Sequence, residues 1–118
     1  MRPNRKNQAL ATLITELKRQ ASTQQASIWK RIATDLEKPT RQRRVINVFS
    51  IDKHSKEDDV VIVPGKVLGV GELNHKVTVA ALAFSDEAKE KIDAKGQTMN
   101  IGELMAQRPK GEKVRILG

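Results

Sequence analysis

Residues 76–85, Lys76-Val-Thr-Val-Ala-Ala-Leu-Ala-Phe-Ser85, have the clearest strand pattern in this chain. They are apolar on nearly both faces and lack the alternation of polar and apolar residues that marks a half-exposed strand. Strands of this composition lie inside parallel sheets that helices cover on both sides. We therefore expect a central strand here, within an α/β fold.

The residues just before this segment predict a second strand. Residues 60–63 are uninterruptedly apolar, and Pro64 with Gly65 should end the strand, because proline has no amide hydrogen for a sheet ladder. Further glycines follow at Gly69 and Gly71. Glycine tolerates the backbone conformations of turns, so this stretch predicts tight turns between two strands.

After the central strand the pattern becomes helical. Ser85 is a suitable N-cap residue, and Gly96 should end the helix that begins there. Asn100 and Glu103 stand three apart and predict a capping box for a short helix that ends before Pro109. Strands and helices are therefore expected to be interleaved in this part of the chain.

Weaker patterns flank this region. Residues 45–51 are rich in β-branched side chains and indicate a strand or an extended connector, whereas residues 52–59 indicate a polar loop. Residues 113–117 predict a final strand.

The first third of the chain has a helical period. One apolar stripe predicts a helix over about residues 5–21 and consists of Leu10, Leu13, Ile14, Leu17 and Ala21. A second stripe predicts a helix that Pro39 ends and consists of Ile28, Trp29, Ile32, Ala33 and Leu36. The second helix begins either with a capping box of Ser22 and Gln25 or at Ser27. A two-helix hairpin cannot bury both stripes, so it should pack on the residues that follow.

These elements predict an α/β fold, with a small sheet and interleaved helices preceded by an N-terminal helical hairpin. With 118 residues the chain is expected to be one domain, with a basic helical arm over 1–44 and an α/β core over 45–118. No apolar run approaches the roughly 20 residues that span a bilayer, and the basic start does not resemble a secretory signal. We expect a cytoplasmic protein without membrane partners.

The positive charge of the chain is concentrated in its first third. The formal net charge is +8, and residues 1–44 carry all of that excess while residues 45–118 are balanced. A neutral body with a cationic face suits a polyanion, because Lys and Arg displace the counterions condensed on phosphates. The densest tract, residues 38–44, has four basic residues and is expected to contact phosphate.

The sequence offers little for catalysis or metal binding. It has no cysteine, which excludes disulfides, thiolate metal sites and cysteine nucleophiles. His54 and His75 are isolated, so we expect no metal site, and His75 is interpreted as a solvated turn residue or a base-stacking contact. Residues 65–71 lack the Lys-Ser or Lys-Thr of a P-loop and the third glycine of a dinucleotide fingerprint. We expect no enzyme, no cofactor and no small-molecule substrate.

Two other functions remain open from the residues alone. The first two helices could form the helix-turn-helix of a DNA-binding regulator, although the link between them lacks the usual glycine. Alternatively, the glycine stretch could serve a nucleotide-dependent enzyme, or its amides with Lys66 could hold an RNA phosphate. Trp29 lies on an apolar stripe and is expected in the core, with base stacking as the alternative.

Several motifs resemble a known family. They are Val60-Val-Ile-Val-Pro-Gly-Lys-Val-Leu-Gly-Val-Gly-Glu-Leu73, residues 76–85, Ala88-Lys-Glu-Lys-Ile92, Ile28-Trp29 and Leu36-Glu-Lys-Pro39. They are similar to large-subunit ribosomal protein eighteen-e of archaea and eukaryotes, and to the C-terminal half of bacterial large-subunit protein fifteen. The short length is similar to that of archaeal members. The resemblance implies an irregular winding of strand-strand-helix units, a structural role in the large ribosomal subunit, and no catalysis.

The resemblance also implies large-subunit rRNA and neighbouring ribosomal proteins as partners. We predict that rRNA is bound through phosphates by three groups of residues. They are an arm of Arg2, Arg5 and Lys6, a patch at the helix-to-sheet junction of Lys38, Arg41, Arg43 and Arg44, and loop contacts from Lys53, Lys66, His75 and Lys76.

Overall fold

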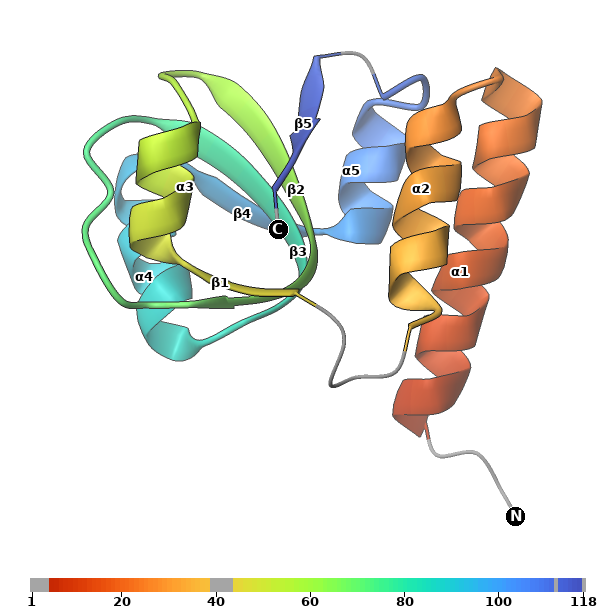
Figure 1. Ribbon diagram of the computed structural model, residues 1–118, viewed down its shortest axis with the longest axis horizontal. Coiled ribbons are helices and arrows are strands. Elements are labelled where there is room, and N and C mark those ends of the chain that lie inside the picture. The colour runs from red at the N-terminus through yellow and green to blue at the C-terminus, as the bar shows by residue number, and fades with distance from the viewer. Residues whose placement is uncertain (1–4, 39–43, 112, 118) are drawn as a thin grey trace.

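The computed structural model of the protein describes residues 5–38, 44–111 and 113–117 (Figure 1). Its elements are α1 (Arg5–Gln24), α2 (Ser27–Leu36), β1 (Arg44–Asn47), α3 (Val48–His54), β2 (Asp59–Leu68), β3 (Val77–Phe84), α4 (Asp86–Lys95), β4 (Gln97–Asn100), α5 (Ile101–Gln107) and β5 (Val114–Ile116). The predicted α/β fold with an N-terminal helical hairpin is confirmed.

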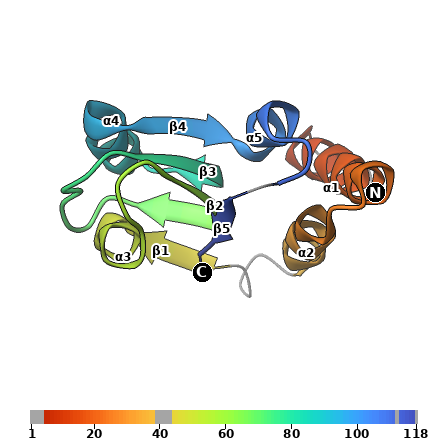
Figure 2. The same ribbon diagram turned by 90° about the horizontal axis from the view of Figure 1, so that it is seen from above.

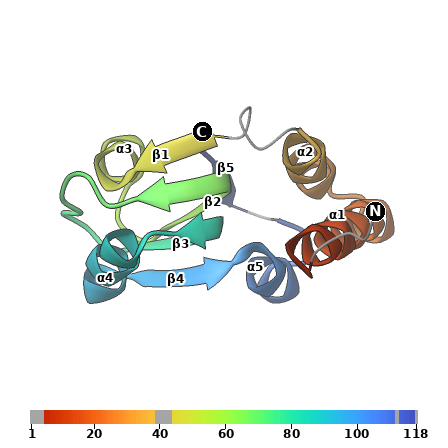
Figure 3. The same ribbon diagram turned by 90° about the horizontal axis from the view of Figure 1, so that it is seen from below.

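The sheet lies between two helical layers. Its order is β1-β2-β3-β4, with β5 also paired to β2, and every described pairing is parallel. Helices α1, α2 and α5 cover one face, and α3 and α4 cover the other (Figures 2 and 3). Alternate residues of β3 therefore enter different cores: Ala80 packs with α2 and α5, while Val79 and Ala81 pack with α3 and α4. The predicted coverage of this strand on both sides is confirmed.

The predicted end of the second strand at Pro64 and Gly65 is wrong. Strand β2 continues through both residues to Leu68, and both are buried. Its register against β3 shifts between Val63 and Lys66, so Pro64 occupies an irregularity where a missing amide hydrogen costs no ladder hydrogen bond. Figure 1 shows that β2 is strongly bent, and its second half pairs with β1.

The glycine-containing segment after β2 is also different from the expected tight turn. Strands β2 and β3 are parallel, so the chain has to return to the opposite end of the sheet before β3 begins. Residues 69–76 make this crossover without a helix, and they contain Gly69 and Gly71 but not Gly65. Lys66 accordingly lies in a strand, not in the loop expected for it.

Two further elements were mispredicted. Residues 48–54, expected as strand and loop, form α3, because Val48 and Ile51 lie three apart and are both buried on one helical face. Lys53, expected in a loop, therefore belongs to this helix. Strand β4 was not predicted, since residues 97–100 contain only one buried side chain, Met99.

The helical hairpin packs on the later part of the chain, as expected. Trp29 is completely buried, which confirms its place in the core, and its indole Nε1 donates to the carbonyl oxygen of Pro109 at 2.6 Å. The capping box proposed for Ser22 and Gln25 is absent: both belong to the end of α1 and its turn, and Ala26 precedes α2 without a side-chain cap.

The caps of the C-terminal helices are as predicted. Ser85 Oγ accepts from the amide of Ala88 at 3.2 Å, and Asn100 forms a capping box with Glu103. Gly96 ends α4, but its φ of −144° is not left-handed. Glycine is needed there for a different reason: an added Cβ would lie 1.9 Å from the carbonyl oxygen of Val77. The helix end and β3 thus approach each other backbone to backbone.

Candidate nucleic-acid interface

The basic tract of residues 38–44 is called the hinge here, and the fold brings its last residue, Arg44, beside Lys66 of the sheet. Helix α2 ends near Lys38, and β1 begins at Arg44, which pairs with Gly65 of β2. One residue on, Val45 pairs with Lys66, and paired residues of parallel strands project to the same face. Lys66 is exposed and forms no ion pair with any residue that the structure describes. The backbones of Arg44 and Lys66 therefore lie close together. We call this place, where β1 begins, the hinge end.

Helix α1 begins at the same end of the molecule (Figure 3). Arg5 lies in its first turn, with Lys6 next to it, although the structure describes only their backbone. Of Arg44, too, the structure describes only the backbone. Arg2, Arg41 and Arg43 lie outside the described residues. At this end Lys38 is 3.4 Å from the carboxylate of Asp35.

The remaining predicted contacts lie elsewhere and are largely compensated by acids. Lys76 Nζ lies 3.9 Å from Asp58, with both side chains well exposed. His75 Nδ1 lies 3.2 Å from Asp52, and its side chain is only 17% exposed. The interpretation of His75 as a solvated turn residue is therefore wrong. Lys53 is exposed at the end of α3, next to Asp52 in sequence. His75 and Lys76 thus each have an acidic neighbour, whereas no ion pair joins Lys53 to a residue that the structure describes.

Asp52, His75 and Ser55 form a chain that looks like a hydrolase triad. His75 Nε2 is 2.8 Å from Ser55 Oγ and its other ring nitrogen faces Asp52. However, Ser55 is buried, and its hydroxyl donates to the carbonyl of Ile51 at 2.5 Å. A buried hydroxyl whose proton is already donated cannot reach a substrate or transfer that proton to histidine. The arrangement instead connects α3 to the crossover loop.

Hydrogen bonds make the contribution of Asp52 to the stability of the fold depend on pH. Its carboxylate accepts from the amide of Asn74 at 2.8 Å and from the Asn74 side chain at 3.1 Å. These hydrogen bonds, with a smaller contribution from His75, lower the pKa of Asp52. Hydrogen bonds that favour the ionised form stabilise the fold at neutral pH, and that contribution disappears as the pH falls below the ordinary Asp value of about 3.9.

We therefore expect the free energy of unfolding of the wild-type protein to fall between about pH 5 and pH 2 more steeply than that of Asp52→Asn. Urea titrations at several pH values measure this, and a carboxyl-carbon NMR titration gives the Asp52 midpoint directly. An Asp52 midpoint at or above the ordinary value would contradict the assignment.

The glycine-containing crossover loop is held by Lys91 of α4. Lys91 Nζ donates to the carbonyl oxygens of Gly69 at 2.6 Å and Gly71 at 2.7 Å, and lies 3.1 Å from the Glu87 carboxylate. The amide of Phe49 donates to the carbonyl of Val70 at 3.0 Å. These loop carbonyls therefore bind groups of the protein itself, which leaves the loop poorly suited to nucleotide binding.

Replacing Lys91 with methionine should destabilise the protein by about 2 kcal/mol, because two charge-assisted hydrogen bonds are lost while the carbon chain is kept. Equilibrium unfolding in urea measures this. Lys89→Met, at an exposed position of the same helix, is the matched control and should change stability by less than about 0.5 kcal/mol. Equal effects of the two substitutions would show that the Lys91 contacts contribute nothing.

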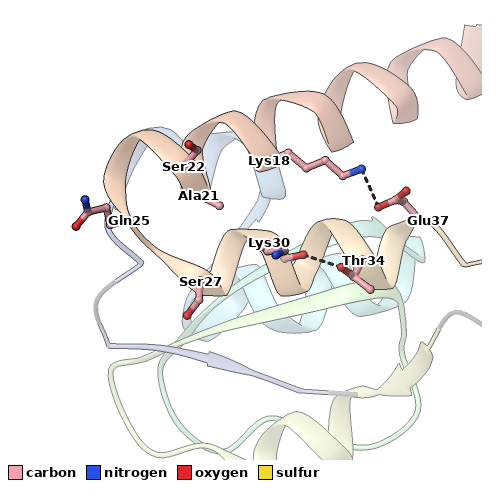
Figure 4. Close-up of a pocket in the computed structure, with 8 residues that line it drawn as sticks. All are labelled: Lys18, Ala21, Ser22, Gln25, Ser27, Lys30, Thr34 and Glu37. Atoms are coloured by element: carbon pink, nitrogen blue, oxygen red, sulfur yellow. Dashed lines mark hydrogen bonds and ion pairs between the residues drawn. The ribbon is translucent and has the colours of Figure 1, made fainter.

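An open groove runs between α1 and α2 (Figure 4). One side is bounded by the Lys18–Glu37 ion pair at 3.1 Å, and within α2 the Thr34 hydroxyl donates to the Lys30 carbonyl. The two helices lie side by side as an antiparallel hairpin (Figure 1) rather than crossing steeply as in a helix-turn-helix. This geometry does not support the DNA-binding alternative.

Among the described residues, no three His, Cys, Asp or Glu side chains gather as a metal site would require. None of the described helices combines the length and apolarity needed to cross a membrane.

Sequence reasoning missed the exposed apolar side chains Val45, Phe49 and Val70. The helical spacing of Val48 and Ile51 could have revealed α3, and with it the outward position of Phe49.

A parallel sheet between two helical layers, together with a formal net charge of +8, defines a class: small basic α/β proteins. The model of a ribosomal protein family, which groups the 50S proteins L15 and L18e with a 60S counterpart, matches residues 9–100. The chain belongs to this family, and the resemblance seen in the sequence is confirmed.

Individual relatives carry a matching name. The chain is 43% identical over 112 residues to "Large ribosomal subunit protein eL18" of Methanothermobacter thermautotrophicus, covering 94% of this chain and 93% of the relative. It is 46% identical over 114 residues to the eL18 protein of Sulfolobus acidocaldarius, with the same coverage. The eL18 protein of Sulfurisphaera tokodaii is 57% identical over 75 residues, 64% of each chain.

Proposed function

We propose that this protein is a non-catalytic structural component of the large ribosomal subunit in the cytoplasm, and that it binds large-subunit rRNA through its hinge end. The family and the names of its relatives support the ribosomal part of the proposal. The hinge end supports the rRNA part, because Lys66 lies there without an ion-pair partner among the described residues, beside the strand that follows the basic tract of residues 38–44. Neighbouring ribosomal proteins would complete its surroundings.

The observation that carries the proposal is the contrast between the two ends of the sheet. At the hinge end, Lys66 has no described ion-pair partner and stands beside the strand that the basic tract enters. At the other end, Lys76 faces Asp58 and Arg115 lies 4.0 Å from Asp59. A phosphate binds more favourably to a lysine that has no acidic partner than to one already in an ion pair. The hinge end is therefore the better binding surface for RNA.

Binding to protein-free large-subunit rRNA over a range of salt concentrations tests this. If about six phosphates are contacted, the logarithm of the affinity should fall with the logarithm of salt with a slope of roughly −4 to −5. The native protein should also sediment with large subunits and be released only in high salt.

The comparison that decides between partners uses small-subunit rRNA and short duplex DNA as competitors. We expect large-subunit rRNA to be retained in preference to both, because RNA is recognised mainly through its shape and backbone placement. No retention on large-subunit rRNA in dilute buffer, or preferential binding of the DNA, would refute the proposal.

A further inference from the structure

Three large apolar side chains are exposed in the described part of the chain, and two of them, Phe49 and Val70, belong to residues that lie side by side. Val45 is 57% exposed, Phe49 is 50% exposed and Val70 is 61% exposed. They belong to β1, to the first turn of α3, and to the crossover loop just after β2. Isolated exposed apolar residues need no explanation, but a group that includes an aromatic ring beside a cationic surface does.

Backbone contacts fix Phe49 in this position. Its amide donates to the carbonyl of Val70, which places these two residues side by side. A Cβ at Gly71 would lie only 2.4 Å from the Cβ of Phe49, and the φ of Gly71 is +102°, so the loop packs against Phe49 as closely as glycine permits. Lys91 holds the same loop from α4. Phe49 therefore stands on a preorganised support.

One lysine lies on the same helix as the ring. Lys53 lies four residues after Phe49 on α3, so the two side chains share one face of the helix, and Lys53 is exposed. An aromatic ring beside a lysine is an arrangement with which proteins bind unpaired nucleotides, in which the ring stacks on the base and the cation binds a phosphate.

The chemistry favours RNA over a protein partner. Protein interfaces are built around an apolar core depleted of lysine, whereas Phe49 has only Val70 as an exposed apolar neighbour and has Lys53 on its own helix face. A single base needs only one ring.

We propose that Phe49 is a stacking platform for an unpaired base of large-subunit rRNA, with Lys53 contacting an adjacent phosphate. This inference rests on the proposed rRNA binding and adds to it a site where the nucleotide is unpaired.

The test compares Phe49→Leu with Phe49→Tyr on protein-free large-subunit rRNA. Leucine keeps an apolar side chain without a flat ring, and tyrosine keeps the ring. We expect Phe49→Leu to bind about five- to a hundredfold more weakly and Phe49→Tyr to bind like the wild type. The salt dependence should be unchanged in both variants, since no charge is altered.

A third variant, Phe49→Trp, reports stacking even if leucine disturbs the fold. Trp29, the single natural tryptophan, is buried, so RNA should not change the fluorescence of the wild-type protein. RNA should quench the new tryptophan in Phe49→Trp.

Wild-type affinity of Phe49→Leu for rRNA, together with no quenching in Phe49→Trp, would overturn the stacking platform while leaving rRNA binding intact. A defect of Phe49→Leu on intact large subunits but not on protein-free rRNA would also overturn it and point to a protein neighbour. Failure of the wild-type protein to bind rRNA would instead refute the proposed function.

Discussion

Replacing Arg41, Arg43 and Arg44 together with alanine should weaken binding to large-subunit rRNA about a hundredfold in roughly 0.1 M salt, where phosphate contacts are only partly screened. The expected cause is the loss of about three phosphate contacts, which should also flatten the salt slope by about two to three units. Arginine is suited to such fixed contacts because its planar fork can bind one phosphate with two hydrogen bonds. Filter binding or fluorescence anisotropy across a salt series measures both quantities.

A variant with the same loss of charge elsewhere separates local contact from net charge. Lys56, Lys89 and Lys95 are exposed and lie outside the hinge end, so their joint replacement with alanine also removes three positive charges. We expect this control to bind rRNA within a few-fold of the wild type. A salt slope left unchanged by the arginine substitutions would place the rRNA contacts elsewhere on the surface.

Replacing Gly96 with alanine should destabilise the protein by about 3 kcal/mol or more. The new Cβ would lie 1.9 Å from the carbonyl oxygen and 2.8 Å from the amide nitrogen of Val77, and both atoms belong to the backbone of β3. No side-chain rotation relieves such a collision, so the end of α4 has to separate from the sheet. Thermal unfolding followed by circular dichroism should show a midpoint lower by at least about 10 °C.

Gly102→Ala is the matched control. Gly102 lies in α5, where an added Cβ would meet only the Asn100 side-chain oxygen, at 3.3 Å. Alanine is the better helix former, so the change in stability should stay within about 1 kcal/mol. If the two alanine variants unfold at similar temperatures, the close approach of Gly96 to β3 is not a requirement of the fold.

The sequence correctly predicted the elements that are determined by the periodicity of apolar residues and by helix-capping residues. The apolar stripe containing Trp29 identified α2, the apolar pattern of residues 76–85 identified β3, and Ser85 and Asn100 marked the helix starts that they cap. In each case the preference of the segment agrees with its place in the fold.

The errors arose where the tertiary structure overrides a local preference. Pro64 normally ends a strand, but a register shift in a bent strand accommodates it. The composition of residues 48–51 favours a strand. They form the start of helix α3 instead, because Val48 and Ile51 are buried on the same face of a helix.

The candidate site was predictable only in part. The basic tract of residues 38–44 is visible in the sequence. That Lys66 stands beside it, and that Lys53 and Lys76 do not, depends on the register of β1 against β2. The contact of Asp52 with His75 forms only because the crossover loop returns along the sheet.

The parallel pairing of every described strand also bears on how quickly the chain can acquire its structure. The strand pairs closest in sequence include Lys66 with Ala83, and the most distant include Val60 with Val114. No described β-hairpin is present to nucleate the sheet, so each ladder has to close a long loop first. Such a high contact order predicts slow folding kinetics for its size, in milliseconds to seconds rather than microseconds.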